Sequence, residues 1–124
     1  MSYIIITNNP LIQNKYSHDE LVVVQKYQDV LLKARDYVHQ GHKLLSHPQA
    51  GSIKPYETPY RTIIMSSEQN ELDFKSLHYI ESALERFTVL SNSMGLREYD
   101  EQCINDFQVI DEGLIRSAIA SMNH

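Results

Sequence analysis

Two stretches of the sequence carry side chains suited to binding a small anion. The first is Thr7-Asn8-Asn9-Pro10, which directly follows the apolar run Tyr3-Ile4-Ile5-Ile6. Asn is a favoured helix N-cap and Pro is favoured at the first helical position, so this stretch predicts the start of a short helix. Unpaired backbone N–H groups there, beside the Asn8 and Asn9 amides, favour an anion such as a carboxylate. The same asparagines also suit a plain turn and cap without a ligand.

The second stretch, residues 48–61, is rich in proline and long for a connection. Pro48, Pro55 and Pro59 prevent a regular helix and restrict the loop to fewer conformations. Long prolyl loops are often functional. Lys54 and Arg61 could receive a carboxylate or phosphate; alternatively, the loop is a surface lid whose charges are solvated. Together with the first stretch, the candidate ligand-binding residues are Asn8, Asn9, His47, Ser52, Lys54, Glu57, Thr58 and Arg61.

Catalytic and metal-binding patterns are weak. His47 could act as a general base oriented by Glu57, although a single histidine near a loop also suits a structural hydrogen bond. The sequence has no G-x-S-x-G elbow, P-loop or dinucleotide fingerprint. Cys103 falls on the apolar face of a predicted helix, where a small buried residue is expected rather than an activated thiolate. No cysteine has zinc-ligand spacing and the histidines do not cluster, so neither a metal site nor a cofactor is predicted.

Hydrophobic periodicity predicts the elements that position these residues. Short apolar runs indicate strands at 3–6, 21–24, 44–45 and 62–65. Apolar residues at helical spacing indicate helices at 10–16, at 27–38 with a stop at Gly41, from Asp73 to near Gly95, and at 103–122. The pattern leaves open a break or new cap in the last helix near 111–113.

This order predicts a single α/β domain over residues 1–124. Its small, mostly parallel, four-stranded sheet has helices on both faces, and two helices form the C-terminal part. The first two crossovers contain helices and should be parallel and right-handed. The last connection between strands has no helix, so the direction of the fourth strand is open, with a preference for antiparallel. Because ligands bind beyond the carboxyl ends of parallel strands, both candidate stretches should share one rim.

Composition limits the partners. The 124 residues carry a formal net charge of −5, which disfavours binding to nucleic acid phosphates. The longest apolar runs have four residues, so no membrane span is expected, and no secretory signal is evident. A lone cysteine fits a reducing compartment. These features predict a cytoplasmic globular protein.

Several strings of the sequence resemble the GrdX family. They are Thr7-Asn8-Asn9-Pro10, Gly41-His42-Lys43-Leu44-Leu45-Ser46-His47-Pro48, the loop from Gly51 to Tyr60, Leu72-Asp73-Phe74, and the segment from Asp106 to Asp111. The likeness covers nearly the full chain. Members are small proteins encoded with the glycine, sarcosine and betaine reductase systems of amino-acid-fermenting anaerobes. The resemblance therefore implies an accessory role near that pathway, and it supplies no catalytic residues.

Three functions remain in competition. The favoured one is a non-catalytic accessory or regulatory protein that binds a small anionic molecule or a reductase component at the strand-end rim. The second is a small enzyme that uses His47 and Glu57 for acid–base chemistry, with Lys54 or Arg61 holding an anionic substrate. The third is an interaction protein that uses the helix surfaces of residues 73–93 or 99–122. A homodimer is compatible with each of them.

Overall fold

The central strand is buried on both sides, which explains its uninterrupted apolar sequence. The computed structural model describes residues 2–48, 58–94 and 99–122. Strand β1 (Tyr3–Thr7) directs Ile4 and Ile6 into one hydrophobic cluster and Ile5 into another on the opposite face. Because successive side chains of a strand point to opposite faces, a strand between two helix layers needs apolar residues at every position.

The sheet has three strands in the order β2-β1-β3. Strand β2 (Glu20–Val23) is parallel to β1, as expected for a helical crossover. Strand β3 (Thr62–Ser66) is antiparallel to β1, which confirms the preferred direction of the last predicted strand. The register places Thr62 opposite Thr7, so the start of β3 lies at the carboxyl end of β1.

The predicted four-stranded, mostly parallel sheet is wrong at residues 44–45. Leu44 makes one isolated antiparallel bridge to Met65 and no strand forms. Leu45 N donates to Ile64 O at 2.8 Å, but Ile64 N donates to the hydroxyl of Ser46 at 2.9 Å. A side chain has taken the place of the backbone carbonyl that a continued ladder would require. The result is a mixed three-stranded sheet.

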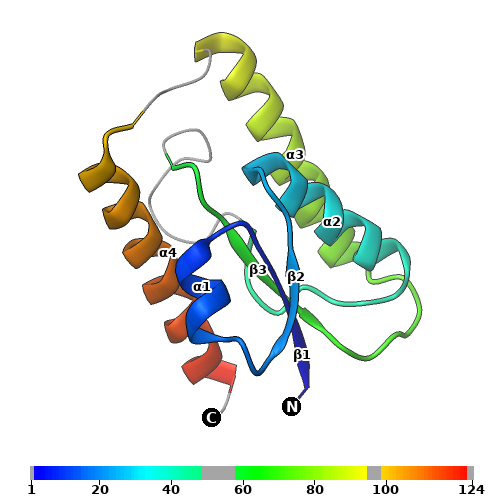
Figure 1. Ribbon diagram of the computed structural model, residues 1–124. Coiled ribbons are helices and arrows are strands. Elements are labelled where there is room, and N and C mark those ends of the chain that lie inside the picture. The colour runs from blue at the N-terminus through cyan, green and yellow to red at the C-terminus, as the bar shows by residue number, and fades with distance from the viewer. Residues whose placement is uncertain (1, 49–57, 95–98, 123–124) are drawn as a thin grey trace.

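Helices cover both faces of the sheet, as the sequence predicts (Figure 1). Helices α2 (Tyr27–His39) and α3 (Phe74–Met94) pack on the face of Ile4 and Ile6. Helices α1 (Pro10–Lys15) and α4 (Glu101–Met122) pack on the face of Ile5. Helix α4 continues through residues 111–113, so the break left open there does not occur. In the described part of the chain, no helix combines the length and apolar character needed to cross a bilayer.

Gly41 lies just after α2, where its backbone conformation and its surroundings both require a glycine. Its φ of +102° lies in the region that other residues rarely adopt. Asn70 N donates to Gly41 O at 3.0 Å, and a Cβ atom at this position would collide with the backbone of Asn70. The glycine therefore allows the chain after α2 to lie directly against the chain that leads into α3.

Candidate functional site

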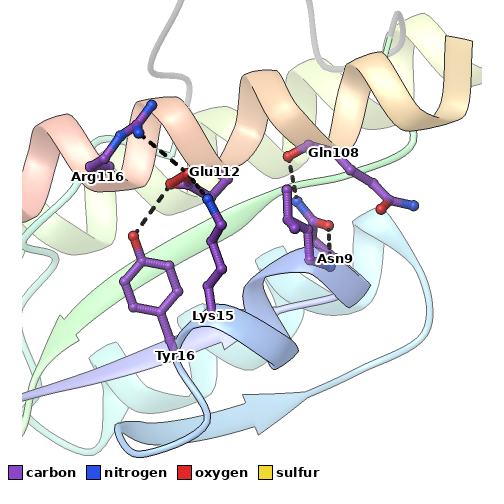
Figure 2. Close-up of polar contacts among 7 residues, drawn as sticks. Asn9, Lys15, Tyr16, Gln108, Glu112 and Arg116 are labelled. Atoms are coloured by element: carbon purple, nitrogen blue, oxygen red, sulfur yellow. Dashed lines mark hydrogen bonds and ion pairs between the residues drawn. The ribbon is translucent and has the colours of Figure 1, made fainter.

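Asn9 caps α1 and also connects it to α4. Its Oδ1 atom accepts a hydrogen bond from Leu11 N at 3.0 Å, with Pro10 at the start of the helix. Its Nδ2 atom donates to Gln108 O and to Asp111 Oδ2, each at 3.0 Å. Figure 2 shows the bond to Gln108 crossing from one helix to the other. The fully buried side chain thus uses both ends of its amide within the protein.

Asn8 joins the end of β1 to the segment that enters β3. Its Nδ2 atom donates to Pro59 O at 2.8 Å, and its Oδ1 atom accepts from Arg61 N at 3.0 Å. Thr58, at the start of this segment, is buried, and its hydroxyl accepts from Tyr60 N at 3.3 Å. The asparagine pair and the end of the proline-rich stretch therefore lie side by side at the carboxyl end of β1.

A chain of hydroxyl groups links these residues to a buried carboxylate. Asn9 N donates to Thr7 Oγ1 at 3.0 Å, and Thr7 Oγ1 lies 2.7 Å from Thr62 Oγ1. Thr62 Oγ1 in turn donates to Asp111 Oδ2 at 2.6 Å. Each hydroxyl has one proton, so the bond between the two threonines must run from Thr7 to Thr62. Every hydrogen bond in the chain then points toward Asp111.

Asp111 combines deep burial with partial compensation of its charge. Only 4% of the residue is exposed. Burial raises the pKa of its carboxyl group, because the charged form loses solvent, while the hydrogen bonds from Thr62 and Asn9 and the positive charge of Arg61 oppose that rise. The group is therefore held in a network whose donors favour its ionised form.

Arg61 supplies a buried positive charge beside this network. It is 3% exposed, and its Nε atom donates to Tyr27 Oη at 3.0 Å. The guanidinium carbon lies 5.4 Å from the centre of the Tyr27 ring, which in turn stacks on Phe87. Burial raises the pKa of the Tyr27 hydroxyl, so it stays neutral beside Arg61. Tyr27 and Phe87 thus provide an aromatic support that fixes the guanidinium.

A pocket of about 280 Å³ opens between β3, α4 and the chain before Pro48. Its polar lining residues include Arg61, Thr62 and Asp111, and its apolar lining comes largely from α4. The full lining is Leu45, Ser46, His47, Arg61, Thr62, Asp111, Leu114, Ile115, Ala118, Ser121 and Met122. The network described above therefore faces a hollow, and two of the sequence candidates, His47 and Arg61, line it.

His47 occupies the exposed side of the pocket. Its ring centre lies 4.8 Å from that of Tyr79 on α3. It also lines a second hollow of about 450 Å³, which contains Lys43 and Lys75. His47 therefore lies between two hollows, and the second of them is also lined by Asp73.

Glu112 forms a separate polar cluster that holds α1 against α4. Its carboxylate lies 3.0 Å from Lys15 Nζ and 3.8 Å from Arg116 Nη1, and it accepts a 3.4 Å hydrogen bond from Tyr16 Oη (Figure 2). The Glu112 side chain is only 4% exposed, so it needs these partners to offset the loss of solvent. This cluster lies outside the pocket lining and fixes the position of α4.

The remaining predictions from the sequence concern three loop residues, a metal site and Cys103. Ser52, Lys54 and Glu57 lie outside the described residues, so the pairing of His47 with Glu57 stays a prediction. Within residues 2–48, 58–94 and 99–122, no three His, Cys, Asp or Glu residues gather as a metal site. The expectation that Cys103 is buried is wrong. It is exposed, whereas Ile104 and Phe107 on the same helix are half-buried. A hydrogen bond with the nearby Asp100 carboxylate raises the pKa of the thiol.

Sequence reasoning missed Asp111, Thr62 and Tyr27 as parts of this site. A usable signal existed for Asp111, since it interrupts the apolar spacing from Phe107 to Leu114 in the last helix. A carboxylate inside an apolar stripe is rarely buried without a polar partner. Thr62 and Tyr27 gave no such signal, because each fits an ordinary strand or helix core position.

Comparison with known proteins adds the family. The family model described as GrdX-like protein matches residues 4–120. No curated protein and no solved structure matches the chain. The matched range includes β2, β3 and all of β1 except Tyr3, and it also contains Asn8, Asn9, Arg61 and Asp111. Because this model covers almost the whole sequence, the chain belongs to the GrdX-like family.

Proposed function

We propose that the protein is a non-catalytic accessory or regulatory component of the glycine, sarcosine and betaine reductase system, and that it binds a small ligand with an anionic group in the Arg61 pocket. The GrdX-like family associates the chain with glycine reductase-related systems. The observation that carries the proposal is the buried guanidinium of Arg61 in the lining of a pocket.

The residues that line the pocket suit a ligand with one polar part and one apolar part. The guanidinium of Arg61 can receive a carboxylate or phosphate, and water is largely excluded there, which strengthens the attraction. Leu114, Ile115 and Ala118 offer a compact apolar wall. A volume of about 280 Å³ lies just below the range typical of drug-sized ligands, so it suits a small metabolite.

The pH of the assay matters because Asp111 lines the same pocket. Its negative charge repels an anion, and its hydrogen bonds from Thr62 and Asn9 together with Arg61 reduce that repulsion. The network thus places a carboxylate and a guanidinium side by side in the pocket lining. We expect binding of an anion to strengthen as the pH is lowered through the Asp111 pKa.

The experiment is a thermal-shift and calorimetry screen with glycine, sarcosine, betaine, acetyl phosphate and nucleotides. A ligand present at 100 times its Kd should stabilise the fold by about 2.7 kcal/mol. Ser121→Trp places a large ring at the exposed edge of the pocket and should abolish binding. The matched control is Ser117→Trp, an exposed serine one turn earlier on α4 that does not line the pocket.

A reductase component is the other candidate occupant, and a pull-down with the separate reductase subunits tests it. The exposed side chains of Val109 and Ile110 favour this alternative, because they offer apolar surface on α4, the same helix that lines the pocket. Absence of stabilisation by every ligand, together with absence of binding to every subunit, would contradict the proposal.

The enzyme alternative rests on His47, which lines the pocket. If His47 is a general base, His47→Gln should abolish turnover of a bound ligand while leaving its Kd nearly unchanged. If the ligand that binds is recovered unaltered after long incubation with the protein, the accessory function is favoured over the enzyme.

A further inference from the structure

Two side chains of opposite charge are buried in the lining of the Arg61 pocket. Asp111 and Arg61 both belong to this lining, and each residue is less than 5% exposed. The positive charge of Arg61 acts on the Asp111 carboxyl group and favours its ionised form. Charged side chains are rarely buried this deeply unless they are paired. A ligand that enters the pocket therefore meets a negative group and a positive group together.

The side-chain hydrogen bonds to Asp111 reach only one of its two oxygen atoms. Asn9 Nδ2 donates to Oδ2 at 3.0 Å, and Thr62 Oγ1 donates to Oδ2 at 2.6 Å. Among the described residues, no side chain donates to Oδ1. An ionised carboxylate can accept about four hydrogen bonds over its two oxygens. Asp111 therefore keeps the capacity to accept hydrogen bonds from a ligand.

A ligand with a single charge fits only half of this lining. A simple anion is attracted by Arg61, but it displaces water from the pocket and is repelled by the Asp111 carboxylate. A simple cation is attracted by Asp111 and repelled by Arg61. A ligand that carries both charges places each one against its opposite. The group that is left unpaired when the wrong ligand binds then provides the specificity.

The apolar part of the lining selects the remainder of the ligand. Leu114, Ile115 and Ala118 form a wall of α4 in the same pocket as the charged pair. An α-amino acid carries its ammonium and carboxylate groups on the same carbon atom, so the two charges can reach neighbouring side chains. Its side chain leaves that carbon in a third direction and can contact the apolar wall.

We infer that the ligand of the pocket is an α-amino acid with an apolar side chain, with its carboxylate at Arg61 and its ammonium group at Asp111. This inference rests on the proposed function, because it names the class of ligand for the same pocket. Asp111 is then the residue that selects an amino acid over a simple anion. Asn9 and Thr62 hold its carboxylate through Oδ2 and leave Oδ1 for the ammonium group.

Isothermal calorimetry of the full chain tests the inference with ligands that differ by one group. L-Leucine carries both charges and an apolar side chain, 4-methylpentanoate lacks the ammonium group, and 3-methylbutylamine lacks the carboxylate. L-Leucine should bind about 10- to 100-fold more tightly than either analogue, because each analogue leaves one buried charge unpaired. Glycine lacks the apolar side chain and should bind at least about tenfold more weakly than L-leucine.

Asp111→Asn tests the carboxylate directly, with circular dichroism confirming the fold. The substitution removes the negative charge and keeps the size of the side chain, so L-leucine and 4-methylpentanoate should then bind within about threefold of each other. The matched control is Asp106→Asn, which removes an exposed carboxylate from the same helix outside the pocket lining. This control should keep the full preference for L-leucine.

The possible results separate this inference from the proposed function. If 4-methylpentanoate binds the native chain as tightly as L-leucine does, the inference is overturned and the pocket is a site for simple anions. Equal binding of glycine and L-leucine, or a full preference for L-leucine in Asp111→Asn, would also overturn it. If none of these ligands and no other anion binds, the proposed function fails as well. The comparison of ligands on the native chain decides the inference even if Asp111→Asn does not fold.

Discussion

Replacing Asn9 separates its two structural roles and gives a stability change that the geometry predicts. Asn9→Ala removes the helix cap on Leu11 and both bonds from Nδ2 to α4. Asn9→Ser keeps a side-chain oxygen suited to capping and removes only the bonds to α4. The two variants together therefore measure the cap and the connection between helices separately.

The magnitude follows from the bonds that are lost. A cap contributes about 1 kcal/mol. The bond to Gln108 O contributes about 1 kcal/mol, and the bond to the Asp111 carboxylate about 1.5–3 kcal/mol. Asn9→Ser should thus lower the free energy of unfolding by about 2.5–4 kcal/mol, and Asn9→Ala by about 3.5–5 kcal/mol, since Asn9 is fully buried.

Urea unfolding followed by circular dichroism measures both variants, with the denaturant slope checked to be unchanged. The difference between the two variants should equal the cap contribution. If Asn9→Ser unfolds within about 0.5 kcal/mol of the native chain, the connection from Asn9 to α4 does not contribute to stability and the reasoning fails.

Two further changes test the same physical picture. Burial raises the pKa of Asp111, so the folded state keeps the carboxyl proton to a higher pH than the unfolded state does. The stability that this proton provides is fully present below the pKa of Asp111 in the unfolded state, and it is lost as the pH rises through the pKa in the folded state. The stability of Asp111→Asn relative to the native chain should therefore increase with pH from about 4 upward, and urea titrations that show a constant difference would contradict this. Gly41→Ala should cost about 3 kcal/mol, because φ is +102° and the new Cβ collides with Asn70. Gly113→Ala should instead stabilise by about 0.5–1 kcal/mol, because Gly113 lies within α4 and its new Cβ would make only an ordinary contact with the Arg116 side chain. Thermal unfolding measures the stability of both glycine variants, and equal effects of the two substitutions would refute the structural role given to Gly41.

Local signals in the sequence predict most of the elements. Asn9 and Pro10 determine where α1 begins, and Gly41 determines where the chain leaves α2, because each acts through its own backbone preference. The apolar runs at β1 and β3 appear as strands for a similar reason: a strand covered on both faces needs apolar residues throughout.

The missing fourth strand shows the limit of such reasoning. Leu44 and Leu45 are apolar, but the ladder stops where the Ser46 hydroxyl binds Ile64 N. That contact joins residues far apart in sequence, so no local pattern reveals it. The order of the strands has the same origin, since pairing of β1 with β3 depends on tertiary packing.

The sequence predicts where the candidate residues gather, and it identifies only some of the residues that line the pocket. The end of β1 and the start of β3 follow from the rule that sites lie beyond strand ends. Asp111 reaches that point from α4 through Asn9 and Thr62, which are about 100 and 50 positions away in the chain. Such a network forms only once the helices have packed, so the sequence alone does not identify its members.

Ligand binding in the Arg61 pocket is the central claim, and amide chemical-shift mapping by NMR tests it most directly. Titration with the tightest ligand from the screen should shift the amides of Ser46, Thr62 and Leu114, which line the pocket, and leave those of Val23 and Val89 unchanged. Shifts that centre on another surface, or their absence at saturating ligand, would contradict the account.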